Sequence, residues 1–459
     1  MYGDELTIVY DSYSILKTGM DQTGQRLPLV FEMGEGRLGG YIYASLPFVY
    51  FFGLTAFGVR ALSLLSGVGI IITIYFLSKT LFKNNNMALL ASFIASISPW
   101  EIYLSRGGFE AHFALFMCLL GITLFLYKKY IVSAVLFGIT IFTYPTFKLT
   151  LPLVILMLMV YQGTRDLVKN KTFYLFIFIL SFFGVASLSM SFKGLSEARF
   201  LSLNIFSDTN VKASIVERVN EARLISPLPE SVKQLVFNKP IYYSRLLLDK
   251  YMENLSFDFL YLRGDRNPRH NPAEWGMNFL VELPLLFIGF YFLFTKDRRI
   301  FYLILSWILI TPLATMFMGQ THALRDNLML PALILISSYA IFNLKSKRLK
   351  YLIIFLMLLQ LIFILIRVYF YAPYKFGSFW SEKAMTISGF VFKNKNNFEK
   401  VVISKKIDNI EYAYPVYVKI NPIVVINQNR SKDKEYENVL LTDDLDKYRK
   451  LKNYLIIDP

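Results

Sequence analysis

Charged residues are scarce in this sequence. Only 18% of the 459 residues are Asp, Glu, Lys or Arg, and 55% are hydrophobic, whereas a soluble domain usually carries roughly a quarter charged residues. Many of the 49 Lys and Arg residues stand in short links between apolar runs. The low charge content argues against a soluble protein, and the scattering of the cations argues against a nucleic-acid-binding surface.

Several other features are missing. Cys118 is the only cysteine, so no intramolecular disulfide can form. The first residues, MYGDELTIVYDSY, are polar and acidic, unlike a cleavable signal peptide. No phosphate-binding glycine loop, dinucleotide fingerprint or nucleophile elbow is present. These absences argue against a nucleotide-driven pump and a soluble-type nucleotide-sugar enzyme. They favour a substrate taken from the lipid bilayer or from the outer side of the membrane.

Long apolar runs, in contrast, are abundant, and a helix crosses the hydrocarbon core with about 20 residues. The sequence predicts ten candidate spans, several of them short: Arg60–Leu81, Met87–Leu104, Ala111–Leu126, Ile131–Tyr144, Leu149–Gln162, Thr172–Phe192, Asn278–Phe294, Ile300–Met318, Asn327–Asn343 and Tyr351–Tyr371. The stretch from Tyr41 to Leu54 contains Pro47 and is either an eleventh span or, as we favour, an interfacial helix.

The charges in the short links predict the orientation, because cytoplasmic links carry an excess of Lys and Arg. One alternating set of links is strongly basic and is expected in the cytoplasm. It contains Lys79, Lys83, Lys128, Lys129, Arg165, Lys169, Lys171, Lys296, Arg298, Arg299, Lys345, Lys347, Arg348 and Lys350. The protein is expected to cross the plasma membrane several times, with the other links on its outer side. Because the number of spans is even, both termini are expected on the outer side as well.

The same pattern predicts three regions of an all-α polytopic membrane protein. Residues 1–59 form a first outer loop, residues 60–371 form the bundle, and residues 372–459 form a small extracytoplasmic α/β domain. Within the bundle, residues 193–277 are expected to form a helical outer loop packed at the membrane surface. The tail has β-like runs at KVVISK around Val401, AYPVYVKI around Val416 and NYLIID at the end.

Acidic residues in the outer segments are the candidates for catalysis. Asp4 and Glu5 are adjacent, and crowding near a membrane surface could raise the pKa of one carboxyl group so that it acts as a general base. An exposed polar terminus explains the pair equally well. Arg106 and Glu110 flank the glycines of the turn SRGGFEAH. They could belong to a functional site, or they could form a salt bridge that only closes the turn.

Cations and histidines of the outer links are the candidates for binding the substrate. Lys148 follows Pro145 in the turn TYPTFK and could hold a phosphate or reach to lipid headgroups. His322 and Arg325 lie in another short link, and Asp265, Arg269 and His270 lie in LRGDRNPRH. No metal-ligand spacing motif is present, so no metal or other cofactor is predicted, although a divalent metal is not excluded.

Four of these motifs, in this order, resemble the membrane glycosyltransferases of the C-type fold. They are Asp4-Glu5, SPWEIYLSRGGFEAHFALF from Ser98, TYPTFKLTLPL from Thr143 and THALRDNLMLPALIL from Thr321. The sequence is most similar to family 39, the protein O-mannosyltransferase and aminoarabinose-transferase group. The resemblance covers the whole membrane region and implies a C-type bundle of about ten to eleven spans with the motif-bearing links around one outer cavity.

The resemblance also implies an activity. Such enzymes move a hexose or pentose from a polyprenyl-phosphate donor to an acceptor on the outer face, and the acceptor here is open between protein, lipid and glycan. By motif position, Asp4 resembles the base, with Glu5 beside it, and Glu110 resembles the second acidic residue. Arg106, Lys148 and Arg325 are inferred to bind the lipid phosphate, because its leaving charge needs positioned cations.

The chain departs from the family pattern at two places. The family has a transmembrane helix before the acidic pair, whereas this sequence begins at Met1, three residues before Asp4. Either such a helix lies upstream of Met1, or the terminus is held in another way. Relatives often show a Pro-Pro-Leu-Tyr-like stretch where this chain has RLGGYIYASLP. The alternatives to a transferase are a secondary transporter or lipid-linked sugar flippase, and an inactive truncated relative.

Overall fold

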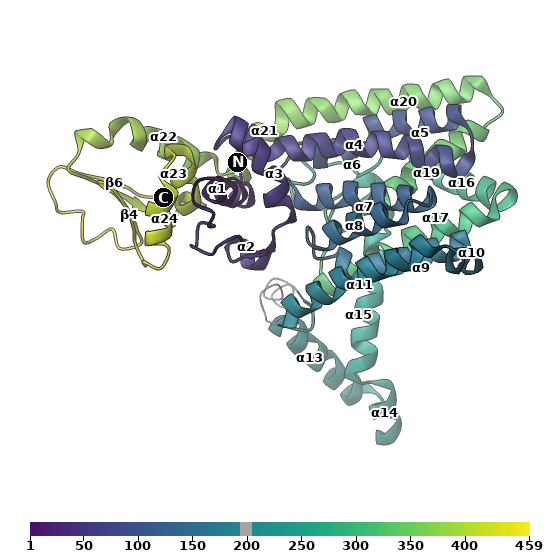
Figure 1. The fold of residues 1–459 in the computed structure, drawn as a ribbon. Helices are drawn as coiled ribbons and strands as arrows, with labels where there is room; N and C mark the ends of the chain where they lie inside the picture. The colour runs from purple at the N-terminus through teal and green to yellow at the C-terminus, as the bar shows by residue number, and fades with distance from the viewer. Residues whose placement is uncertain (193–203) are drawn as a thin grey trace. The chain divides into compact units, whose positions relative to one another are not determined.

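The structure is a computed structural model that describes residues 1–192 and 204–459. It divides into two compact units, each built from segments that are distant in the sequence. The first unit comprises Met1–Leu65, Ser105–Glu110 and Ile366–Pro459, and the second comprises Ser66–Leu104 and Ala111–Leu365. The prediction of a mostly helical chain is confirmed (Figure 1).

The N-terminal part of the first unit is a helix followed by a small hairpin and a second helix. Its elements are α1 (Gly3–Thr18), β1 (Val30–Phe31), α2 (Met33–Gly36), β2 (Arg37–Leu38) and α3 (Gly40–Phe52). The two strands pair antiparallel, with Phe31 opposite Arg37. Helix α3 packs on α1, and the hydroxyl groups of Ser12 and Ser45 lie 2.9 Å apart. The hairpin therefore brings Arg37 back towards α1.

The C-terminal part of the first unit contains a four-stranded sheet in the order β4-β5-β3-β6. Strand β3 pairs parallel with β5 and β6, and β4 pairs antiparallel with β5. The elements are η3 (Arg367–Tyr371), α21 (Ala372–Lys375), η4 (Gly377–Trp380), α22 (Glu382–Asn394), η5 (Lys395–Asn397), β3 (Lys400–Ser404), α23 (Ile410–Val418), α24 (Pro422–Gln428), β4 (Lys434–Tyr436), β5 (Val439–Thr442) and β6 (Tyr454–Ile457).

The strand predicted around Val416 is wrong, because this run forms helix α23. Residues Ala413, Tyr414, Pro415 and Val416 are all buried, so the alternation of buried and exposed residues that marks a half-buried strand is absent. Short apolar runs without that alternation do not distinguish strand from helix. Packing decides here, since α23 lies against α1 and α22.

The second unit is a helical bundle, and every apolar run predicted to span is helical. The helices are α4 (Ala56–Phe82), α5 (Asn85–Ile97), α6 (Pro99–Ser105), α7 (Glu110–Leu126), α8 (Tyr130–Ile141), α9 (Phe147–Gln162), α10 (Thr164–Val168), α11 (Lys171–Phe192), α16 (Glu282–Lys296), α17 (Arg298–Ile310), α18 (Pro312–Thr315), η2 (Met316–Met318), α19 (Met329–Asn343) and α20 (Lys347–Ile366). Helices α4, α6, α7 and α20 begin or end in the first unit.

Within the described residues, four helical stretches are long and apolar enough to cross a membrane. They are Ala56–Phe82, Lys171–Met190, Arg298–Met318 and Lys347–Lys375. Helices α5 and α6 make a fifth if the pair is one span bent by 56°. The bend falls at Ser98, whose backbone is extended because a following proline disfavours the helical conformation. Helix α3, with 13 residues, is among the shorter apolar helices.

Helix α19 is the core of the bundle. All its residues from Met329 to Ile341 are buried, as expected for a helix that is apolar on every side. It packs against α16, α5 and α17. A Cβ atom on Gly289 of α16 would lie 2.5 Å from Cγ2 of Ile336, so a glycine at this position allows the two helices to approach closely.

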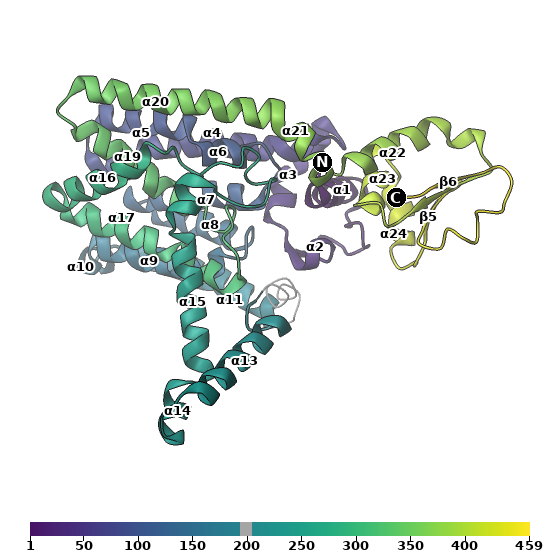
Figure 2. The same ribbon diagram turned by 180° about the vertical axis from the view of Figure 1, so that it is seen from behind.

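The segment predicted as a long outer loop is mostly helical from residue 204 to Leu262 and irregular from there to Met277. It contains α13 (Thr209–Ile225), α14 (Glu230–Val236), α15 (Lys239–Asn254) and the one-turn helix η1 (Asp258–Leu262). Figures 1 and 2 show α15 leaving the bundle, with α14 at its far end, where α13 also ends. The part of the predicted loop from Lys193 to residue 203 lies outside the described residues.

Candidate functional site

The adjacent acidic residues Asp4 and Glu5 lie in the first turn of α1, where the helix dipole favours negative side chains. The sequence predicted that their carboxylates would crowd one another. They do not, because successive helix positions point about 100° apart and each carboxylate pairs with a different arginine: Asp4 with Arg37, and Glu5 with Arg60.

Arg37 joins Asp4 to Glu110. Its Nη2 lies 2.5 Å from Oδ1 of Asp4, and its Nε lies 2.5 Å from Oε1 of Glu110. Its Nη1 donates to Oγ1 of Thr7 at 2.6 Å. The arginine is only 2% exposed. The two acids that the sequence singled out from separate outer segments are therefore held together by one buried guanidinium group.

The ionisation of Arg37 follows from these neighbours. Burial alone would lower the pKa of Arg37, but the carboxylates of Glu110 and Asp4 outweigh burial and raise the pKa above its usual value. The guanidinium group thus stays charged at any working pH. The side chain of Asp4 is 40% exposed and that of Glu110 only 10%. Asp4 is the member of this triad that can meet a molecule from solution.

Glu5 is buried, and its carboxylate is fully engaged. Arg60 binds it with Nε to Oε1 at 2.6 Å and Nη2 to Oε2 at 2.7 Å. The backbone N–H of Gly108 donates to Oε1 at 2.9 Å. A Cβ atom on Gly108 would lie 3.0 Å from Cγ2 of Val59, so a glycine lets this backbone come close. Glu5 therefore fastens α1 to the turn that precedes Glu110.

Aromatic residues from the C-terminal segment border this site. The Arg60 guanidinium lies 5.1 Å from the ring centroid of Trp380, which also meets the ring of Tyr2 edge-on at 5.4 Å. Arg106, in the turn before Glu110, lies 6.0 Å from the ring centroid of Tyr369. Cation–π contacts of this kind hold arginine side chains in place. Within the first unit, the predicted residues Asp4, Glu5, Arg106 and Glu110 thus belong to one neighbourhood.

The other predicted site residues belong to the second unit. His270 and His322 come together, with ring centroids 4.4 Å apart. Arg269 and Arg325 flank these histidines in the chain, and both are half-buried. Lys148 is half-buried in the first turn of α9.

Asp265 connects the two loops that carry the histidines. Its Oδ2 accepts from the backbone N–H of Ala323 at 2.8 Å and lies 2.9 Å from Nδ1 of His270. Its Oδ1 accepts from the backbone N–H of Asn267 at 2.8 Å. Burial alone would raise the pKa of Asp265, but His270, His322 and these hydrogen bonds bring the pKa well below its usual value.

Asp265, His270 and His322 are also the residue types that bind divalent metals. One possible ligand atom from each lies within 4.8 Å of the other two. Backbone N–H groups already donate hydrogen bonds to both carboxylate oxygens of Asp265. The three side chains can therefore hold a cation, and they can equally connect the two loops through hydrogen bonds alone.

Replacing Asp265 with alanine is expected to lower the free energy of unfolding by about 1–3 kcal/mol, because buried donors lose their acceptor. Thermal unfolding of the purified protein in detergent measures the loss, with exposed Asp249→Ala as control. Because folding lowers the pKa of Asp265, its stabilisation is complete above the unfolded-state pKa of about 3.9 and disappears as the pH falls further. An equal effect of both variants would contradict the role of Asp265.

Sequence reasoning missed Arg37 and Arg60 as site residues. Arg60 was assigned only as the start of a span. Arg37 is the only cation between Arg26 and Arg60, in a stretch rich in glycine and apolar residues. A lone cation in such a stretch is costly to bury without a partner, and this signal could have identified it.

Comparisons with known proteins bear on the fold. No protein-family model and no curated protein sequence matches this chain. The solved structure of the archaeal oligosaccharyltransferase AglB from Archaeoglobus fulgidus, in complex with an inhibitory peptide and a dolichol-phosphate, matches loosely. It is 12% identical over 91% of this chain and 60% of AglB, with a TM-score of 0.44.

A fuller match comes from ArnT of Cupriavidus metallidurans. The apo structure is 12% identical, covers 90% of this chain and 79% of ArnT, and has a TM-score of 0.54. The structure bound to undecaprenyl phosphate is 13% identical, covers 91% and 81%, and has a TM-score of 0.55. These matches show that the chain shares the fold of ArnT, and its described residues include four helical stretches long and apolar enough to cross a membrane.

Proposed function

We propose that this protein is an integral membrane glycosyltransferase that moves a sugar from a polyprenyl-phosphate donor to an acceptor on the extracytoplasmic face. The observation that carries the proposal is the triad of Asp4, Arg37 and Glu110. It offers one accessible carboxylate, Asp4, held by a buried cation. The C-type fold and the undecaprenyl phosphate bound to ArnT support the class of donor.

In the proposed reaction, Asp4 is the general base. A hydroxyl or amino group of the acceptor gives its proton to the Asp4 carboxylate while its oxygen or nitrogen attacks the anomeric carbon of the sugar. The bond from that carbon to the phosphate oxygen breaks, and polyprenyl phosphate leaves with the electron pair. A phosphate leaves without help from an acid, so one base is sufficient, unlike the two carboxyl groups of glycoside hydrolysis.

The other members of the site position the base. Glu110 neutralises part of the Arg37 charge, so Asp4 keeps its basicity beside a cation. Glu5 is buried in its own ion pair and is assigned a positioning role. Our candidates for binding the lipid phosphate are Arg106 in the first unit and, separately, Lys148 and Arg325 in the second, since cations stabilise a developing phosphate charge. We assign a role in substrate binding to three residues of the second unit, Arg269, His270 and His322.

The test is a transfer assay with the purified protein in lipid nanodiscs. It is supplied with undecaprenyl-phosphate-linked hexoses and pentoses and with mixed extracytoplasmic acceptors, and mass spectrometry follows the products. The expected result is a glycosylated acceptor and stoichiometric free undecaprenyl phosphate. If proteoliposomes instead move the intact lipid-linked sugar across the bilayer without a covalent product, the protein is a flippase. If neither occurs with any donor, the transferase assignment is wrong.

A further inference from the structure

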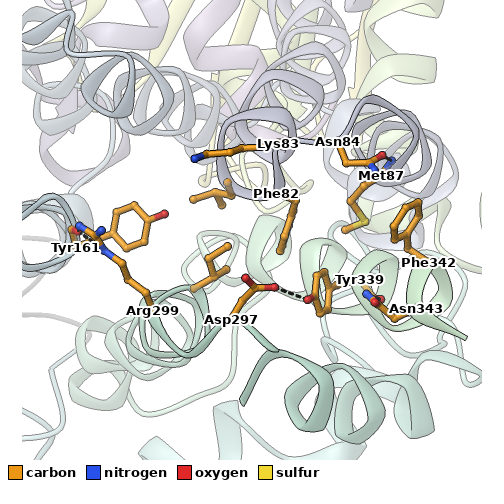
Figure 3. Close-up of a pocket in the computed structure, with 12 residues that line it drawn as sticks. Phe82, Lys83, Asn84, Met87, Tyr161, Asp297, Arg299, Tyr339, Phe342 and Asn343 are labelled. Carbon is orange, nitrogen blue, oxygen red and sulfur yellow. Dashed lines mark hydrogen bonds between the residues drawn. The ribbon is translucent and has the colours of Figure 1, made fainter. Parts of the chain in front are cut away.

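The bundle contains a polar cavity that the proposed transfer does not use. It has a volume of about 430 Å³ and lies where the links α4–α5 and α16–α17 meet the ends of α9 and α19. Figure 3 shows Lys83 and Asn84 on one side of it and Asp297 and Arg299 on the other. These links belong to the basic set of the sequence analysis, so the cavity lies at the basic end of the bundle.

Two cations and one anion define the charge of this cavity. Lys83 directly follows α4 and has a positive φ of 51°, a conformation in which a residue other than glycine is uncommon. Asp297 is hydrogen bonded by the hydroxyl group of Tyr339. Lys296 adds a further positive charge at the edge, where its Nζ donates to Asn343 at 2.7 Å. The surroundings attract a single negative charge more strongly than they attract a neutral molecule.

An apolar groove continues from the cavity. It has a volume of about 620 Å³ and is lined by residues of α9 and α17, among them Leu156, Val160 and Leu309. Tyr161 and Arg299 line both the cavity and the groove. The Nε of Arg299 donates to the backbone oxygen of Tyr161 at 2.9 Å, and the guanidinium lies 4.9 Å from the Tyr161 ring centroid. Arg299 is therefore fixed at the junction of the two.

We infer that this cavity and groove form a binding site for an anionic glycerophospholipid, with the headgroup in the cavity and an acyl chain in the groove. The juxtaposition of a basic polar cavity and an apolar groove, joined at Arg299, matches a molecule with a charged head and a hydrocarbon tail. An arginine guanidinium carries five N–H donors, and the contacts to Tyr161 leave donors for a phosphate.

The lining favours a phosphodiester over the phosphate monoester of a polyprenyl carrier. A monoester carries about −1.5 to −2 charges at neutral pH, and the Asp297 carboxylate repels the second charge. A diester carries one charge, and a hydroxylated headgroup such as glycerol donates hydrogen bonds to Asp297 while Asn84 and Asn343 meet its oxygens. The cavity volume lies within the range of small-molecule sites, about 300–1,000 Å³, so it has space for a headgroup larger than a bare phosphate.

The test measures lipid binding by native mass spectrometry of the purified protein, titrated separately with phosphatidylglycerol, phosphatidylcholine and undecaprenyl phosphate. We expect phosphatidylglycerol to bind most tightly. Lys83→Gln is expected to weaken its binding about tenfold, the size expected when a hydrogen bond to a charged group is lost. Exposed Lys345→Gln, at the same end of the bundle, is the matched control and should leave binding unchanged.

A second variant tests the groove without touching the charges. Val160→Trp fills the groove at an exposed position and should displace phosphatidylglycerol while thermal unfolding stays unchanged. The inference is wrong if phosphatidylcholine binds as tightly as phosphatidylglycerol, or if Lys83→Gln and Lys345→Gln have equal effects. Tighter binding of undecaprenyl phosphate would overturn the choice of a diester.

Discussion

Replacing Asp4 with asparagine is expected to lower the rate of sugar transfer by roughly 10²–10⁴-fold, the usual contribution of a general base. Asparagine has nearly the same shape, and its amide oxygen can still accept from Arg37, so the fold around the site should persist. What is lost is the group that takes the proton from the acceptor. The initial rate of product formation from a polyprenyl-phosphate donor measures the effect.

The control for this variant is Asp444→Asn, which changes an exposed aspartate of the C-terminal sheet region and should transfer at the normal rate. Glu110→Gln separates positioning from base chemistry. It keeps the shape of Glu110 but leaves the Arg37 charge to Asp4 alone, which lowers the basicity of Asp4. Its rate should fall less than that of Asp4→Asn, because the carboxylate of Asp4 is still present to take the proton. Unchanged transfer in both Asp4→Asn and Glu110→Gln would contradict these roles.

The helices of the bundle were predictable because their signal is local. A run of about 20 apolar residues in lipid must satisfy its own backbone hydrogen bonds, and a helix does this within the segment. All ten predicted runs form helix over most of their length, although only four stretches, or five with the bent pair, are long and apolar enough to cross a membrane. The bend between α5 and α6 also has a local signal, Pro99 after Ser98, yet a hydropathy count passes over it because proline barely changes the mean.

The site was only half predictable from the sequence. The candidates Asp4, Glu5 and Glu110 are visible as acidic residues beside apolar runs. Their partners are not, because the pairing of Asp4 with Arg37 and of Glu5 with Arg60 depends on how the hairpin after β1 and the start of α4 pack on α1. Similarly, His270 and His322 meet through Asp265 and Ala323, and no spacing along the chain encodes that contact.

Replacing Arg37 with methionine is expected to lower the free energy of unfolding by about 3–5 kcal/mol, the usual cost when one partner of a buried ion pair is removed. Methionine keeps much of the side-chain volume, so the loss comes from the carboxylate of Glu110, which would stay buried without its cation. Thermal unfolding in detergent measures it. Arg26→Met, at an exposed position of the same loop, is the matched control and should change stability little.

The combination with Glu110→Gln isolates the ion pair from the general effect of mutating a buried residue. If the buried charge is what destabilises Arg37→Met, then removing that charge as well should restore part of the loss, with a coupling energy of about 0.5–3 kcal/mol. The free energy of unfolding of Arg37→Lys should lie between those of the unchanged protein and Arg37→Met. An ammonium group keeps the charge but lacks the planar fork that reaches Asp4 and Glu110 at once. Purely additive losses would show that Arg37 stabilises by packing alone, and Glu110 would then have no means of acting on Asp4.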